Sequence, residues 1–249
     1  MPIFNKITVC ILTKNAESTI EETLDSTHLF SEVLILDNGS TDATLAIASK
    51  YPNVVIHKAP FIGFGPLRNR LAELATNDWI LALDSDEIVS PPLSQELDQL
   101  TLDPHFTYNF PRHNFYDGKQ VRGCGWDKEY VARLYNRNAT RFSDALVHES
   151  LITLKPLTLQ YPLLHTPYRS TTEFLAKMQH YSTLFAEQHR GKKSSSFSKA
   201  LLHGIYAFIR SYFFKKGIFC GKRGFIISLY NANTTFYKYL KLYEVNRNG

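Results

Sequence analysis

Cysteine is scarce in this chain of 249 residues, where Cys10, Cys124 and Cys220 are odd in number and far apart. The sequence contains no C-x-x-C pair, so neither a disulfide framework nor a structural zinc site is expected. The scarcity of cysteine therefore indicates a fold that is held by its own core and suits a reducing compartment.

Long apolar runs are missing as well. The apolar segment nearest the start covers residues 7–12, and Lys14 and Asn15 follow at once, so it is too short for a secretory signal. No stretch approaches the roughly 20 apolar residues that span a bilayer. We therefore expect a cytoplasmic protein.

Acidic residues are nearly absent from the last quarter of the chain. Residues 1–185 hold 16 Lys and Arg against 21 Asp and Glu, a charge of −5. Residues 186–249 hold 12 against 2, a charge of +10, so the net charge of +5 comes from the tail. A basic tail favours polyanions or an anionic membrane surface as partners.

The remaining pattern predicts an α/β protein with two regions, 1–165 and 166–249. Strands are predicted at 7–12, 32–36, 54–57 and 79–83, and helices at 17–29, 43–50 and 66–75. Apolar strands that alternate with helices are typical of a mainly parallel, Rossmann-like sheet with helices on both faces. Antiparallel strands are predicted at 108–116 and 130–135, followed by helices at 171–189, 197–219 and 223–244.

Polar side chains occur where three of the predicted strands end. They are Thr13-Lys14-Asn15, Asp37 with residues 38–42, and Asp84-Ser85-Asp86-Glu87. The ligand crevice of an open α/β sheet lies at these carboxyl ends. Two carboxylates one residue apart suit Mg²⁺ or Mn²⁺, which also binds diphosphate oxygens and neutralises a departing nucleoside diphosphate.

Each motif also has an ordinary structural interpretation. Asp84-Ser85-Asp86-Glu87 is compatible with a solvated turn, and residues 38–42 with a turn and a helix cap. Another metal-dependent nucleotide-sugar or phosphoryl-transfer enzyme stays open, although Ile88 replaces the Thr or Val of haloacid dehalogenase phosphatases. A nucleic-acid-binding module is disfavoured because the acidic front half repels phosphate, so we expect no nucleic acid partner.

Longer segments resemble the family 2 glycosyltransferases, and within them the bacterial lipopolysaccharide core glucosyltransferases. The matching segments cover nearly the whole chain: ITVCILTKNAE (7–17), VLILDNGSTDATLAIASKY (33–51), GFGPLRNRLAELATNDWILALDSDE (63–87), GWDKEYVARLYNR (125–137), VHESL (147–151) and HTPYRSTTEFLAKMQHYS (165–182). The resemblance implies a GT-A fold and inverting transfer of a hexose from a nucleotide sugar. Glucose from UDP-glucose is the preferred donor, and a lipopolysaccharide core or other glycolipid at the inner membrane face is the acceptor.

The resemblance also implies roles for individual residues. Asp86 ligates the metal, and Asp84 lies beside the ribose and the metal. The other donor-binding candidates are Thr13, Asn15, Asp37, Arg68, Asn69 and Ser85.

Inverting transfer needs one general base for the acceptor hydroxyl. The candidate is Glu149, which His148 orients unless His148 binds the metal instead. The rival carboxylates are Asp127, Glu129 and Asp144, and the role of His165 stays open.

The segment 197–219 carries a broad apolar face at helical spacing, for example at Leu201, Ile205 and Phe208. Arg210, Lys215 and nearby basic residues interrupt it. A basic, aromatic, amphipathic helix suits the surface of an anionic membrane. A helix packed on the catalytic domain is the alternative.

Overall fold

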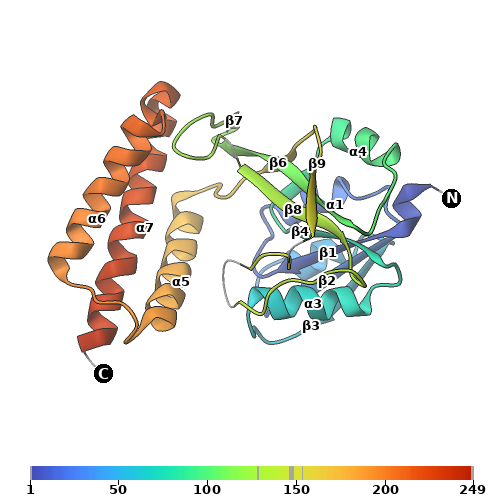
Figure 1. The fold of residues 1–249 in the computed structure, drawn as a ribbon, viewed down its shortest axis with the longest axis horizontal. Coiled ribbons are helices and arrows are strands. Elements are labelled where there is room, and N and C mark those ends of the chain that lie inside the picture. The colour runs from blue at the N-terminus through green and yellow to red at the C-terminus, as the bar shows by residue number, and fades with distance from the viewer. Residues whose placement is uncertain (1, 128, 146–148, 153, 248–249) are drawn as a thin grey trace. The chain divides into compact units, whose positions relative to one another are not determined.

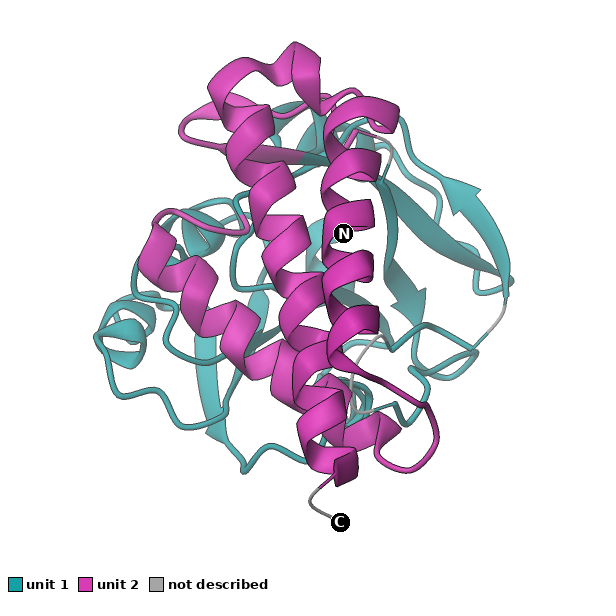
Figure 2. Cartoon of the chain, turned by 90° about the vertical axis from the view of Figure 1, so that its left-hand side faces the viewer, with its two compact units in different colours: residues 1–113, 129–166 teal, residues 114–128, 167–249 magenta. Residues whose placement is uncertain are grey.

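The computed structural model describes residues 2–127, 129–145, 149–152 and 154–247 (Figure 1). The chain divides into two compact units (Figure 2). The first comprises Met1–His113 with Glu129–Thr166, and the second comprises Asn114–Lys128 with Pro167–Gly249. The predicted division at residue 165 did not include the contribution of residues 114–128 to the second unit.

The first unit contains a sheet with flanking helices. Its strands are β1 (Ile7–Thr13), β2 (Glu32–Asp37), β3 (Val54–Lys58), β4 (Trp79–Asp84), β5 (Glu87–Val89), β8 (Glu129–Asn136), β9 (Lys155–Thr158), β10 (Leu163–His165) and most of β6 (Phe106–Tyr116). Its helices are η1 (Ile3–Lys6), α1 (Ile20–Asp25), α2 (Thr44–Ala48), α3 (Phe64–Leu74) and α4 (Pro91–Asp98).

The strand order is β3-β2-β1-β4-β8-β6-β10-β5, and β9 pairs with β6. Strands β3, β2, β1 and β4 are parallel, whereas β8 joins β4 in the antiparallel direction. The register places Thr13 opposite Asp37, and Leu12 opposite Asp84. The polar residues that follow these strands therefore lie side by side at one edge of the sheet.

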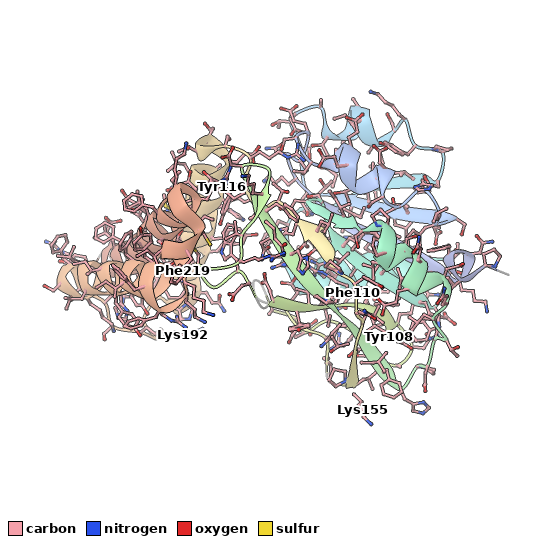
Figure 3. The ribbon with its side chains drawn as sticks, turned by 90° about the horizontal axis from the view of Figure 1, so that it is seen from above. Tyr108, Phe110, Tyr116, Lys155, Lys192 and Phe219 are labelled. Carbon is pink, nitrogen blue, oxygen red and sulfur yellow. The ribbon has the colours of Figure 1, made fainter. Side chains whose placement is uncertain are left out.

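Burial explains why these segments form a parallel sheet. Every residue of β1 is buried, and its side chains alternate between two cores. Ile7, Val9 and Ile11 pack in one core with α1, while Cys10 and Leu12 pack in the other with α3. Tyr108 and Phe110 of β6 extend the first core (Figure 3). Helices on both faces confirm the predicted fold class.

The second unit is mainly helical. It contains α5 (Thr171–His189), α6 (Phe197–Ile209), the π-helical turn η2 (Arg210–Phe214), the 3-10 turn η3 (Gly217–Cys220), α7 (Gly221–Arg247), and β7 (Lys119–Gln120), which pairs with the end of β6. Ser170 and Ser196 cap α5 and α6, each hydroxyl accepting a hydrogen bond from a backbone N–H of the first turn. No helix within the described residues is long and apolar enough to cross a membrane.

The predicted helix at 197–219 is wrong in its second half. The α-helix ends at Ile209, widens into η2 and reverses at Lys216, whose φ of +59° is left-handed. The reversal brings backbones so close that a Cβ on Gly224 would lie 1.8 Å from the carbonyl oxygen of Gly217. Glycine is therefore required at this corner.

Candidate active site

Asp84, at the end of β4, is held by guanidinium groups from three elements. Its Oδ1 lies 2.5 Å from Arg68 Nη2 of α3, and its Oδ2 pairs with Arg133 Nη2 of β8. Arg112 Nη1 of β6 lies 3.9 Å from the same Oδ2. Burial disfavours the charged form of Asp84, but Arg133 and Arg68 outweigh burial and hold its pKa well below the ordinary value.

Glu87 is the fully buried centre of the same network. Its Oε1 accepts hydrogen bonds from Arg133 Nη2 at 2.7 Å and Arg112 Nη1 at 3.0 Å. Its Oε2 accepts the backbone N–H of Asp84 at 3.1 Å. Glu87 therefore fixes the turn that presents the two aspartates of the motif, which explains why an acid follows them.

Arg68 connects the motif to the predicted general base. Its side chain is 4% exposed, and its Nε donates to Glu149 Oε1 at 2.9 Å. One guanidinium thus joins Asp84 and Glu149, which are far apart in the sequence. Glu149 keeps 13% of its side chain exposed. His148 lies outside the described residues.

Arg68 and Arg133 each have one buried nitrogen whose N–H groups are not paired with an acceptor among the described residues. Among the described residues, the buried Nη1 of Arg68 and Nε of Arg133 have no hydrogen-bond acceptor. The pKa of both arginines is above the ordinary value. Burial lowers it, but the charges of the neighbouring carboxylates, of Asp84 most of all, together raise it by more. Permanently charged planar donors of this kind suit the oxygens of a diphosphate.

Asp86 faces His165 across the pairing of β5 with β10. His165 Nε2 lies 3.5 Å from Asp86 Oδ1, and the two side chains are 12% and 13% exposed. The backbone next to His165 is joined to Asp86 as well, because Thr166 N donates to the carbonyl of Asp86 at 3.3 Å. The sequence left the role of His165 open, and the structure places it beside the predicted metal ligand.

This pair fits a divalent cation that is completed by substrate. No group of three or more His, Cys, Asp or Glu side chains suited to a metal occurs in the part of the chain that the structure describes. Mg²⁺ is usually held by one or two carboxylates together with substrate phosphates. An imidazole nitrogen beside a carboxylate is a donor set compatible with a transition-metal ion such as Mn²⁺.

The ends of β1 and β2 form a cross-linked double loop. The Asp37 carboxylate accepts hydrogen bonds from Gly39 N at 3.0 Å and from Ser40 N and Oγ at 3.1 and 2.5 Å. Asn15, with a φ of +51°, accepts from Thr41 N at 2.8 Å through its Oδ1. The two strand ends are therefore joined by hydrogen bonds of their own side chains.

Thr13, beneath this loop, has a buried Oγ1 without a partner among the described residues. That Thr13, Asn15 and Asp37 contact the nucleotide base stays a prediction. The structure adds that the Asp37 carboxylate also holds the loop together by accepting hydrogen bonds from Gly39 and Ser40.

Two other predicted residues have structural partners. Both ends of the Asn69 amide bind the backbone of Phe142, each at 2.9 Å. Asn69 thereby fixes the backbone at Phe142, and its contact with the donor stays a prediction. The carbonyl of Ser85 accepts from Thr23 Oγ1 at 3.1 Å, which ties the motif to α1.

The rival carboxylates have different surroundings from Glu149. Glu129 receives two hydrogen bonds from Arg112, at 2.5 and 3.1 Å. Asp144 lies on an exposed ion pair with Arg141 at 3.5 Å. Asp127 belongs to the second unit. Of these four described carboxylates, Glu149 is the one bound to the same guanidinium group, that of Arg68, that also forms a hydrogen bond with Asp84.

Arg112 and Arg133 are site residues that sequence reasoning missed. The signal in the sequence is a charged residue inside an otherwise apolar strand, as in the segment YVARLY around Arg133. A strand residue with a buried charge requires a buried counter-charge. Its partners, however, follow only from the antiparallel register of β8 against β4.

Comparison with known proteins places this site in a family. Residues 8–155 match the model of Glycosyl transferase family 2. An uncharacterized glycosyltransferase of Rickettsia typhi is 28% identical over 97% of this chain and 88% of its own length. The lipopolysaccharide core biosynthesis glycosyltransferase LpsC of Rhizobium meliloti is 26% identical over 94% of this chain and 90% of its own length.

Among solved structures, S. aureus TarS in complex with UDP-GlcNAc has a TM-score of 0.49 at 16% identity, covering 98% of this chain and 92% of that one. The family match alone spans more than half of the sequence and includes the strand ends, the Asp84–Asp86 motif and the segment containing Glu149. The resemblance found in the sequence is confirmed: the chain belongs to glycosyl transferase family 2 and is a glycosyltransferase.

Proposed function

We propose that this enzyme moves a hexose from a nucleotide-sugar donor to a glycolipid, with inversion at the anomeric carbon. The observation that carries the proposal is the single buried guanidinium of Arg68, which joins Asp84 of the donor motif to Glu149. A donor diphosphate and a general base are the two groups that an inverting transfer must place within reach of one sugar carbon.

The donor lies along the carboxyl ends of the parallel strands. Its base is taken up near Thr13, Asn15 and Asp37, and its ribose and diphosphate near Ser85, Asp84 and Arg68. The pairing of Thr13 with Asp37 and of Leu12 with Asp84 supports this path, because it brings the strand ends together in that order. The sequence resemblance favours UDP-glucose as the donor.

Asp86 is the main metal ligand in this proposal, with His165 beside it and Asp84 as the second carboxylate of the motif. When bound, Mg²⁺ or Mn²⁺ neutralises charge on the departing nucleoside diphosphate. Asp84 is the weaker ligand because both of its oxygens already pair with guanidinium groups. Arg68, Arg112 and Arg133 supply further positive charge around the leaving group.

Glu149 accepts the proton of the acceptor hydroxyl. As this proton leaves, the acceptor oxygen bonds to the anomeric carbon, and the bond from that carbon to the diphosphate oxygen breaks. Arg68 orients Glu149 by donating a hydrogen bond to its Oε1 at 2.9 Å. His148 remains a proposed helper of Glu149 or of the metal.

We place the enzyme at the inner face of the cytoplasmic membrane, acting on a lipopolysaccharide core or a related glycolipid. The relative LpsC, named for lipopolysaccharide core biosynthesis, supports this acceptor class. The charge of +10 on residues 186–249 supports association with an anionic membrane surface.

The test is a screen of UDP-, GDP- and ADP-sugars for thermal stabilisation of the chain with Mg²⁺ or Mn²⁺. We expect UDP-glucose to stabilise the protein only when the metal is present, and UDP to be the product released on transfer. Stabilisation by none of the nucleotide sugars would refute the proposal. Release of inorganic phosphate instead of UDP would support the phosphoryl-transfer alternative.

A further inference from the structure

The turn between α6 and α7 lies at one end of the second unit (Figure 1). Four large apolar side chains of this turn are exposed. Phe214 and Phe219 are 74% and 85% exposed, and Phe213 and Ile218 are 54% and 44% exposed. We name these four residues the aromatic tip. Exposed apolar side chains gathered in this way mark an interaction site, because a soluble surface rarely shows them together.

The aromatic tip is held outward by a rigid backbone. Lys216 adopts a left-handed conformation with φ of +59°, and Lys215 O accepts a hydrogen bond from Cys124 N at 2.6 Å. Gly217 is packed so closely that a Cβ on it would lie 2.8 Å from Ser211 O. The backbone of the turn is therefore closely packed beneath the exposed side chains.

The chain segment that carries the aromatic tip is basic. Between residues 188 and 243 the sequence has no Asp or Glu. Arg210, Lys215, Lys216 and Lys222 flank the four apolar residues. Aromatic and aliphatic side chains among basic ones match the interface of an anionic bilayer, where rings enter the acyl boundary and ammonium groups meet lipid phosphates.

A pocket opens directly beside the tip. Its volume is about 230 Å³, and it is lined by Gly125, Asp127, Phe214, Lys215 and Lys216, all of the second unit. Of the described residues, no carboxylate forms an ion pair with the ammonium group of Lys215 or Lys216. Two adjacent ammonium groups suit a phosphate, and the Asp127 carboxylate can accept a hydrogen bond from a hydroxyl of the same headgroup.

We propose that this pocket binds the phosphate-bearing headgroup of a membrane lipid while the aromatic tip enters the bilayer interface. This deepens the membrane association of the proposed function by assigning it to one turn instead of the whole face of α6. It requires only the second unit, so the chemistry of the donor site can be tested separately.

The experiment measures partition of the full chain onto vesicles of phosphatidylcholine, alone or mixed with phosphatidylglycerol. The variant Lys215→Gln/Lys216→Gln is compared with Arg190→Gln/Lys192→Gln. This control removes the same charge at exposed positions near the α5–α6 connection, at the other end of the helical unit (Figure 1). We expect partition onto anionic vesicles to fall about 25-fold in the first variant, since each lysine at an anionic surface contributes about fivefold.

The control should lose less than about threefold, because its charges lie farther from the bilayer and are screened. Equal losses in both variants would overturn the pocket, since they would show that only overall charge matters. Equal binding to vesicles of phosphatidylcholine alone would overturn the requirement for an anionic headgroup. Displacement from vesicles by millimolar glycerol 3-phosphate would show a free phosphate ester, not a lipid, to be the ligand.

Insertion of the tip is tested by Phe219→Trp, a single change at the most exposed of its residues. We expect brominated acyl chains to quench the fluorescence of the new indole. The wild-type chain, whose tryptophans are Trp79 and Trp126, gives the background quenching. Unchanged quenching would exclude insertion. UDP-sugar binding and hydrolysis by each variant should stay at the wild-type level, so that a failure of the donor chemistry is recognised independently of membrane binding.

Discussion

Replacing Glu87 by Gln tests the buried charge network that holds the active-site motif. Glu87 is 0% exposed and binds two guanidinium groups and one backbone N–H. Gln keeps the shape and one acceptor but removes the negative charge between Arg112 and Arg133. Breaking a buried ion pair on one side typically destabilises a protein by about 3–5 kcal/mol. We expect about 3 kcal/mol, the lower end, because Asp84 and Glu129 still neutralise part of the charge.

The measurement is urea unfolding of the full chain at neutral pH, followed by tryptophan fluorescence. The control is Glu21→Gln, which removes a charge from an exposed position of α1 and should leave the unfolding midpoint unchanged. The double variant Glu87→Gln/Arg133→Met should recover part of the loss, because it removes one of the uncompensated charges. A change below about 1 kcal/mol in the single variant, the size of an exposed salt bridge, would refute a buried network.

Three further predictions concern the proposed chemistry and the cysteines. Asp86→Asn and His165→Ala should each weaken activation by Mn²⁺ by about 10- to 100-fold or more, which is the loss typical of disturbed metal surroundings. The control is Asp98→Asn, a change at an exposed position. If the site variants are activated as well as this control, the assignment is contradicted. Glu149→Gln should lower kcat about 100- to 10,000-fold with donor affinity retained, and near-normal turnover would place the base elsewhere. Burial raises the pKa of the Cys10 and Cys124 thiols, so both stay protonated at pH 8. Alkylation should reach Cys220 alone until the chain unfolds, and rapid labelling of Cys10 in the folded protein would contradict its burial.

The strands of the parallel sheet were predictable because burial on both faces makes them continuous apolar runs. The predicted strand at 79–83 corresponds to β4 at Trp79–Asp84, and the one at 32–36 to β2 at Glu32–Asp37. Their ends carry the residues predicted to bind the donor, and that role stays a prediction. The antiparallel strands at 108–116 and 130–135 are β6 and β8.

Helices were predicted less well where tertiary contacts end them. The helix expected at 17–29 is only Ile20–Asp25. Before it, Ala16 N and Glu17 N donate to the side chains of Thr44 and Asp42, and after it the chain continues in turns up to Phe30. The helix expected at 197–219 breaks at a corner that depends on close backbone packing around Gly217 and Gly224. Helix propensity depends on the local sequence alone and therefore takes no account of either set of contacts.

The ion pairs of the site could not be predicted from the sequence, for a different reason. Arg133 meets Asp84 and Glu87 only because β8 runs antiparallel to β4, and Arg68 meets Glu149 only through the fold of the intervening segments. A sequence shows which charges exist, but the register of distant strands decides which of them meet. His165 illustrates the same limit, since its relation to Asp86 follows from the pairing of β10 with β5.

The two aspartates of the motif are therefore not equivalent, and this has a consequence for binding. Asp84 is neutralised by Arg68 and Arg133, so a cation gains little from it while those pairs persist. In the proposed mechanism the donor diphosphate is a second anion for the same guanidinium groups, and we expect its binding to release Asp84 toward the metal. Metal and nucleotide should then bind with positive coupling, and the factor by which UDP raises Mn²⁺ affinity must equal the factor by which Mn²⁺ raises UDP affinity. Calorimetric titration of each ligand with and without the other measures both factors. Arg68→Met should reduce the coupling, whereas independent binding in the wild-type enzyme would show that the arginines do not exchange partners.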